Sequence, residues 1–203
     1  MGTLQKVGRM TQKGIHIIGS RLREQGLGTM VLWIFNRGFS YLTGVPILRR
    51  SRITPRLYVG PQFNQRGLAL LQDADINAVI NMRIEFDDAE EGLLLEEYCH
   101  LPTVDDEAPS LDHIDEGVRF IRRITAEGGK VYIHCAGGIG RAPTMAAAYL
   151  IAEGATLDEA LDQIKRVRPY IRIMPPQIDL LREVEKRQRE RMEAALDKGG
   201  MIQ

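Results

Sequence analysis

The chain has 203 residues, of which 44% are hydrophobic, and its 27 basic residues balance its 27 acidic ones. This length suits one globular domain with some elaboration better than two independent domains. Two cysteines are too few for a disulfide scaffold, so we expect a reducing, cytoplasmic setting.

The charges are divided unevenly along the chain. Residues 1–56 contain ten Lys or Arg residues and one acidic residue, Glu24. A basic arm on an acidic body predicts contact with an anionic surface, such as the surface of a membrane, and we expect no nucleic-acid ligand. We therefore treat residues 1–52 as a basic, partly apolar N-terminal helical extension.

The apolar part of this extension is too interrupted to cross a membrane. Its longest uncharged runs, 25–36 and 38–48, are separated by Arg37 and fall short of the roughly 20 apolar residues of a spanning helix. A signal peptide also fits poorly, because no small-x-small cleavage pattern follows. Two interpretations stay open, an interfacial amphipathic helix with aromatic anchors or an ordinary helix packed on the domain. The aromatic residues are Trp33, Phe35, Phe39 and Tyr41.

From residue 53 onward, short β-rich runs alternate with helical patterns. Strands are predicted at 56–60, 76–82, 98–104 and 130–135, and helices at 66–74, 110–127, 143–154, 156–168 and from 175 onward. This alternation predicts an α/β fold with a mostly parallel central sheet flanked by helices on both faces. We place the domain at residues 53–190 and a solvated C-terminal tail at 191–203.

The segment VYIHCAGGIGR, residues 131–141, places a cysteine between a strand and a helix. In parallel α/β sheets, ligands collect at the carboxyl ends of strands, where helix amino termini point. A glycine-rich loop can turn several N–H groups inward, and Arg141 adds a planar two-pronged donor, so the segment predicts a phosphate cradle. The same positive environment favours a reactive thiolate at Cys135. The alternative is a buried, inert Cys135 and a surface Arg141.

The spacing His134-Cys135-x-x-Gly138-x-x-Arg141 resembles the signature loop of the cysteine-based phosphatases, and the short chain resembles their dual-specificity branch. The resemblance covers roughly residues 53–190. It implies a phosphotyrosine-phosphatase-like fold and a phosphocysteine intermediate formed without metal or other cofactor. His134 would then support the cysteine backbone from behind the site. The phosphate would be held by Arg141 and by the N–H groups of Ala136, Gly137, Gly138, Ile139, Gly140 and Arg141.

An acidic stretch after the third predicted strand offers a proton donor for the leaving group. It contains Asp105, Asp106 and Glu107. In the resembling family the acid lies about six residues before the first apolar residue of the next helix, here Leu111. This spacing implies Asp105 as the general acid, with Asp106 as the alternative. A solvated acidic turn before a helix cap is the remaining interpretation.

Ala142 departs from the family pattern, which usually has Ser or Thr after the loop arginine. The missing hydroxyl would otherwise hydrogen-bond the cysteine sulfur and help it leave the intermediate, so we expect slower breakdown of the phosphoenzyme. Ala142 also leaves open a non-enzymatic phosphate-binding module.

The loop contains no lysine and no arginine besides Arg141, which favours a substrate with a single phosphomonoester. The leading hypothesis is a dual-specificity protein phosphatase acting on phosphotyrosine and on phosphoserine or phosphothreonine. The basic arm favours the alternative, a lipid- or glucan-phosphate phosphatase working at a surface, with the protein peripheral at a membrane.

Two further features have open interpretations. Cys99 is expected to be a buried thiol rather than the partner of Cys135 in a disulfide. In the resembling family the region of Arg168, Tyr170 and Arg172 borders the pocket, although an ordinary helix end is the favoured interpretation here.

Overall fold

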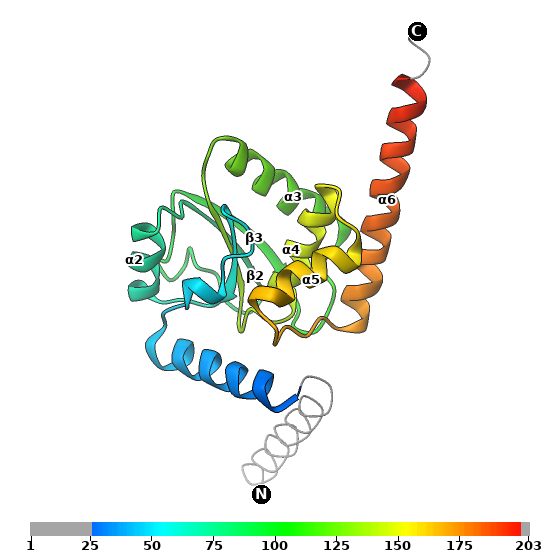
Figure 1. Cartoon of the computed structure of the whole chain (residues 1–203). Helices are drawn as coiled ribbons and strands as arrows, with labels where there is room; N and C mark the ends of the chain where they lie inside the picture. The colour runs from blue at the N-terminus through cyan, green and yellow to red at the C-terminus, as the bar shows by residue number, and fades with distance from the viewer. Residues whose placement is uncertain (1–25, 200–203) are drawn as a thin grey trace, which may run out of the picture.

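A computed structural model of the protein describes residues 26–199 and shows one sheet with helices on both faces (Figure 1). Residues 26–43 are helical. The strands are β1 (Leu57–Pro61), β2 (Ala78–Arg83), β3 (Glu97–Thr103) and β4 (Val131–Cys135). The other helices are the 3-10 helix η1 (Leu48–Arg50), α2 (Gln65–Asp73), α3 (Leu111–Ala126), α4 (Arg141–Ala152), α5 (Leu157–Val167) and α6 (Pro175–Gly199).

The four strands are all parallel, in the order β1-β4-β2-β3. Strand side chains alternate between two cores, as the period of two requires. Val59 and Ile133 belong to the larger core beneath α3 to α6, whereas Tyr58, Val79 and Tyr132 pack toward α2 on the other face. The predicted α/β fold with a parallel sheet covered on both faces is therefore confirmed.

The helix ends follow the signals in the sequence. Ser110 caps α3 by accepting the N–H of His113, and Thr156 forms a capping box with Glu159 at the start of α5. The turn after α4 contains Gly154 at φ 104°, a backbone conformation that side chains rarely allow. The capping residues thus determine where α3 and α5 begin.

The sheet order places β4 between β1 and β2, so the carboxyl end of β4 is flanked on both sides. Helix α4 starts at Arg141, six residues after Cys135, and is buried along nearly its whole length. Its alanines at 146–148 allow α3, α5 and α6 to pack closely around it. The N-terminus of a buried helix thus lies directly after the central strand.

Helix 26–43 packs against the body through one face only. Asn36 and Ser40 are buried, whereas Phe35, Tyr41 and Leu42 are exposed. One face of the helix therefore packs on the domain, as one of the two interpretations predicted. Its other face, which is apolar, is exposed. The basic residues before position 26 lie outside the described residues. Within residues 26–199, no helix is both long enough and apolar enough to span a membrane.

Helix α6 continues past residue 190, and residues 191–196 are exposed. The division at residues 52 and 190 remains a prediction, and positions 200–203 lie outside the described residues.

Candidate active site

Cys135 is the last residue of β4 and is buried at the base of the 136–140 loop. The Gly138 N–H donates to its Sγ at 3.3 Å. Gly138 has φ 63°, and a Cβ there would lie 2.4 Å from the Gly60 carbonyl group at the end of β1. Only glycine can therefore turn this N–H toward the sulfur while the loop closes against β1.

The Arg141 guanidinium lies at the start of α4 and is buried. Its Nη1 donates to the Thr103 carbonyl at 2.9 Å, and Nη2 lies 2.9 Å from Oδ1 of Asp105. Its Nε is buried and has no hydrogen-bond partner among the residues that the structure describes. The alternative of a surface Arg141 is therefore wrong, and the guanidinium keeps one donor that a phosphate oxygen can take.

Glu85, just beyond the carboxyl end of β2, binds the same two terminal nitrogens of the Arg141 guanidinium. Its two carboxylate oxygens accept from Arg141 at 2.8 and 3.0 Å, and Arg83 Nε donates to it at 2.9 Å. The hydrogen bond from Arg141, with help from Arg83, outweighs partial burial and lowers the pKa of Glu85 to about 2. Glu85 is thus an anion at any physiological pH and fixes the orientation of the arginine.

His134 is held by a buried carboxylate on the opposite side of β4 from α4. Its Nε2 lies 2.6 Å from Oδ2 of Asp88, and both side chains are fully buried. Oδ1 of Asp88 accepts from Gln62 at 2.8 Å, and Oε1 of Gln62 accepts from Arg83 at 3.0 Å. Phe63 packs edge-on against the imidazole. This polar chain links the residue before the cysteine to Arg83, and so to Glu85.

Of the two candidate acids, Asp105 is the one that pairs with Arg141. It follows β3, and its side chain is 73% exposed, so it can reach solvent and the site together. Asp106 has φ 66°, as expected in a tight turn. The Glu107 carbonyl accepts from Gln177 at 2.9 Å, which ties this acidic turn to α6. The geometry supports Asp105, while its role as acid remains a proposal.

The segment after α5 supports the loop, so the favoured interpretation as an ordinary helix end is wrong. Arg168 is buried, and its Nε and Nη1 donate to the carbonyls of Gly138 at 3.1 Å and Arg50 at 2.7 Å. The N–H of Arg172 donates to the Ile139 carbonyl at 2.7 Å. Two loop carbonyls are thereby held outward, which leaves loop N–H groups free to face the sulfur.

The remaining predicted positions are placed as follows. Ala142 is fully buried in the first turn of α4. Cys99 is free and buried, as expected, and Cys135 is also free and buried. Burial, with a smaller effect of the Glu116 charge, raises the pKa of Cys99 to about 12. Within residues 26–199, no cluster of three or more His, Cys, Asp or Glu residues is arranged to hold a metal ion.

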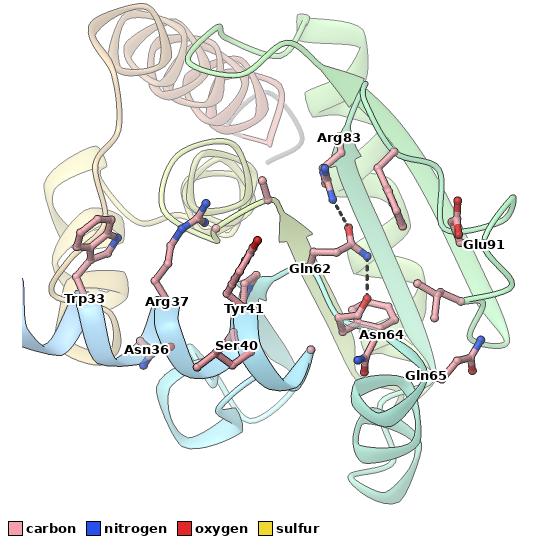
Figure 2. A pocket seen from close by; sticks show the side chains of 18 of the residues that line it. Trp33, Asn36, Arg37, Ser40, Tyr41, Gln62, Asn64, Gln65, Arg83 and Glu91 are labelled. Carbon is pink, nitrogen blue, oxygen red and sulfur yellow. Dashed lines mark hydrogen bonds between the residues drawn. The ribbon is translucent and has the colours of Figure 1, made fainter. Parts of the chain in front are cut away.

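A cavity of about 620 Å³ opens beside the loop, with Ala136 and Gly137 in its wall. Figure 2 shows Arg37 and Tyr41 extending from helix 26–43 on one side of it, and Gln62 and Arg83 on the other. The sequence did not indicate that the N-terminal helix would form part of this site.

Sequence reasoning also missed Glu85 and Asp88. Both follow β2, and the rule that placed a ligand at the carboxyl end of β4 applies equally to this neighbouring strand. Arg37 could not be found in this way, because the sequence around it does not indicate where helix 26–43 packs on the domain.

Comparison with known families decides the class of protein to which this loop belongs. Residues 57–187 match the family described as "Dual specificity phosphatase, catalytic domain". The chain belongs to this family. The predicted dual-specificity branch is thus confirmed, and helix 26–43 lies outside the matched range.

Among curated proteins, the chain is 37% identical over 126 residues to human "Phosphatidylglycerophosphatase and protein-tyrosine phosphatase 1", covering 58% of the chain and 63% of that protein. It is 35% identical over 121 residues to mouse "Dual specificity protein phosphatase 2", covering 59% of the chain and 37% of that protein. The chain thus spans less than two thirds of the length of these relatives.

Solved structures of similar proteins share the fold of this chain. The structure of PTPMT1 in complex with PI(5)P has a TM-score of 0.64 at 30% identity, covering 70% of this chain and 97% of that one. Tk-PTP in the active form has a TM-score of 0.61 at 32% identity, covering 68% of this chain and 96% of that one.

Proposed function

We propose that the protein hydrolyses phosphomonoesters through a phosphocysteine at Cys135. The observation that carries this proposal is the convergence of three elements. The Gly138 N–H reaches the sulfur at 3.3 Å, the buried Arg141 guanidinium starts the following helix, and Asp105 lies 2.9 Å from that guanidinium. A nucleophile, an oxyanion clamp and a proton donor are thus gathered at the carboxyl edge of the sheet, after β3 and β4.

The reaction has two balanced steps. The Cys135 thiolate attacks phosphorus, the bond from phosphorus to the ester oxygen breaks, and Asp105 gives its proton to the departing alcohol or phenol. Water then attacks the phosphocysteine, Asp105 takes a proton from it, and the bond from phosphorus to sulfur breaks to release inorganic phosphate and the thiolate. Arg141 and the loop N–H groups would hold the equatorial oxygens in both steps.

Phosphorylated tyrosine, serine and threonine side chains are the proposed substrates. The loop supplies one arginine and no lysine, which matches a single phosphomonoester. The names of the human and mouse relatives, a protein-tyrosine phosphatase and a dual specificity protein phosphatase, support this class.

The test is turnover of p-nitrophenyl phosphate and of phosphotyrosine and phosphothreonine peptides by the full chain. We expect Cys135→Ser to reduce all three rates to background, because the hydroxyl of serine is not ionised at neutral pH. The matched control is Cys99→Ala, which removes the other thiol and should retain activity. If the wild-type protein is no faster than Cys135→Ser, the chain is a phosphate-binding module and the proposal is wrong.

A second proposal is that the enzyme works at a lipid surface, peripheral to a membrane. The outward face of helix 26–43 supports it, since Phe35 is 62% exposed, Leu42 is 84% exposed, and Phe35 and Phe39 stack with ring centroids 6.3 Å apart. The helix contains no acidic residue, and its inner side lines the cavity beside the loop. Such a helix can lie in a bilayer interface and hold the domain at the lipid surface.

Vesicle sedimentation tests this surface in the full chain. We expect salt-sensitive binding to vesicles of phosphatidylcholine with phosphatidylglycerol, and Phe35→Ser with Phe39→Ser should weaken it at least tenfold, because each buried ring contributes about 1.5–3 kcal/mol. The control is Met192→Ser with Leu196→Ser, which removes two exposed apolar side chains from α6. Equal losses in both double variants would contradict a role for helix 26–43.

A further inference from the structure

Helices α3 and α6 both pack on α4 and leave a groove of about 240 Å³ between them. Its lining comes from these two helices and from Ala152 at the end of α4. None of the described residues that line it belongs to the 136–140 loop or to the acidic turn at 105–107. Figure 1 shows α3 on the side of the domain away from helix 26–43. The groove is therefore separate from the cavity beside the loop.

Each wall of this groove presents two arginines. Arg119 and Arg122 come from α3, and Arg187 and Arg191 come from α6. Spacings of three and four residues put each pair on one face of its helix. Among the described residues of the lining, Asp115 is the one that carries a carboxylate. Both walls of the groove therefore carry positive charge.

Two of these arginines are available to an added anion. Arg122 and Arg187 each donate from Nε to a neighbouring glutamate, at 2.7 and 2.8 Å. Arg119 and Arg191 are exposed, and neither forms an ion pair within the described part of the chain. A guanidinium without a partner keeps its five N–H donors for a ligand. The groove thus has one available cation on each wall.

The surroundings of the groove limit the kind of anion that can bind. Residues 57–203 contain 17 basic and 26 acidic residues, so the groove is a positive patch on an acidic body. A bilayer surface or a nucleic acid would bring many negative charges against that body, whereas a short acidic segment can reach the arginines alone. The volume of 240 Å³ lies below the roughly 300–1,000 Å³ of small-molecule sites. The groove therefore suits the side chains of a protein partner better than a cofactor.

We infer that the groove between α3 and α6 docks a short acidic segment of a partner protein, with Arg119 and Arg191 as its main contacts. A guanidinium binds a carboxylate through two parallel hydrogen bonds, and arginine clusters commonly recognise acidic motifs. The apolar lining residues Val118 and Val184 are only 6% and 9% exposed, so they add little area and binding should depend on charge. This interaction surface does not depend on the proposed hydrolysis at Cys135.

The experiment measures binding of a fluorescein-labelled hexaglutamate peptide to the full chain by fluorescence anisotropy, with a hexaglutamine peptide as the uncharged probe. We expect Arg119→Ala with Arg191→Ala to raise the dissociation constant for hexaglutamate roughly fivefold, because each exposed ion pair contributes modestly. Wild-type binding should weaken as sodium chloride is added, and hexaglutamine should not bind. Both positions are exposed, so the double variant should keep the wild-type unfolding midpoint in urea.

The matched control is Arg49→Ala with Arg52→Ala, which removes two exposed arginines from the basic N-terminal extension. Equal weakening by both double variants would overturn the groove as the binding site, and so would binding that Arg119→Ala with Arg191→Ala leaves unchanged. Tighter binding of a single-stranded oligonucleotide or of phosphatidylglycerol vesicles through the same two arginines would overturn the acidic protein segment as the ligand. None of these outcomes requires turnover, so they stay distinct from the test of hydrolysis at Cys135.

Discussion

The 136–140 loop and helix 26–43 border the same cavity but are held in different ways. The loop is fixed by buried contacts, with Arg168 on the Gly138 carbonyl and Glu85 on Arg141. The helix is seated by a few inward residues such as Asn36 and Ser40, and its other face is exposed. The proposed chemistry thus lies on the segment with buried contacts, and the proposed membrane contact lies on the segment with an exposed face.

The two regions also differ in whether the family match covers them. The loop lies within the matched family, whereas the helix lies before it. Substitutions near the loop should therefore change turnover or folding strongly, and those on the outer face of the helix should change neither.

Apart from loss of the Cys135 thiol, the largest expected effect is that of replacing Asp105. We expect Asp105→Asn to lower kcat roughly 10²- to 10³-fold for alkyl phosphates, because a general acid contributes about that much. The loss should be smaller for p-nitrophenyl phosphate, whose leaving group needs little protonation. Steady-state kinetics on both esters measures this, with Asp106→Asn as the matched control. If Asp106→Asn shows the larger, leaving-group-dependent loss, the acid has been assigned to the wrong neighbour.

Arg168→Met tests how firmly the loop is held. The change keeps much of the side-chain volume but leaves the Gly138 and Arg50 carbonyls without their buried donor. We expect the free energy of unfolding to fall by about 2–4 kcal/mol, as measured by urea denaturation, with reduced kcat in the folded fraction. Arg166→Met is the surface control. A stable, fully active Arg168→Met would mean that the loop keeps its shape without this arginine.

Ala142→Ser restores the hydroxyl that the family usually has after the loop arginine. We expect breakdown of the phosphoenzyme to speed up about threefold, because the added donor stabilises the departing sulfur. Rapid-quench measurement of the pre-steady-state burst reports the formation and breakdown rates separately. An effect on neither rate would remove the proposed role of the missing hydroxyl.

The smallest expected effect is on the helix. Leu42 is 84% exposed, so Leu42→Ser should change the free energy of unfolding by no more than about 0.5 kcal/mol. Leu101 in the core is fully buried, and Leu101→Ala should cost about 2–5 kcal/mol. Urea titrations of both variants sharpen the comparison. Destabilisation of similar size would show that the outer face is packed after all.

Much of this arrangement could be predicted from the sequence, because it depends on local signals. The strand, glycine loop and arginine around Cys135 are contiguous, and Thr156 with Glu159 specifies a helix start by itself. The contacts that could not be predicted join distant segments. Arg168 reaches a loop 30 residues earlier in the chain, and no local pattern distinguishes it from a solvated helix end.

The same limit explains the N-terminal helix. Its amphipathic pattern fits both a packed helix and an interfacial one, and in the structure one face is packed and the other is exposed. Periodicity can show that two faces differ, but only the tertiary fold places Arg37 over Gly137.

The sheet order has a consequence for oxidative damage. Cys99 on β3 is aligned with Ile80 on β2, which is aligned with Ile133 on β4. Two strand spacings separate the Cα atoms of Cys99 and Ile133 by roughly 9.6 Å, and Cys135 lies two residues further along β4, so the two cysteines are beyond the 7 Å or so between Cα atoms that a disulfide allows. A sulfenic acid formed at Cys135 by peroxide therefore has no internal thiol with which to condense. Recovery depends on thiols supplied by the surroundings, and their concentration sets how long an oxidised molecule stays inactive.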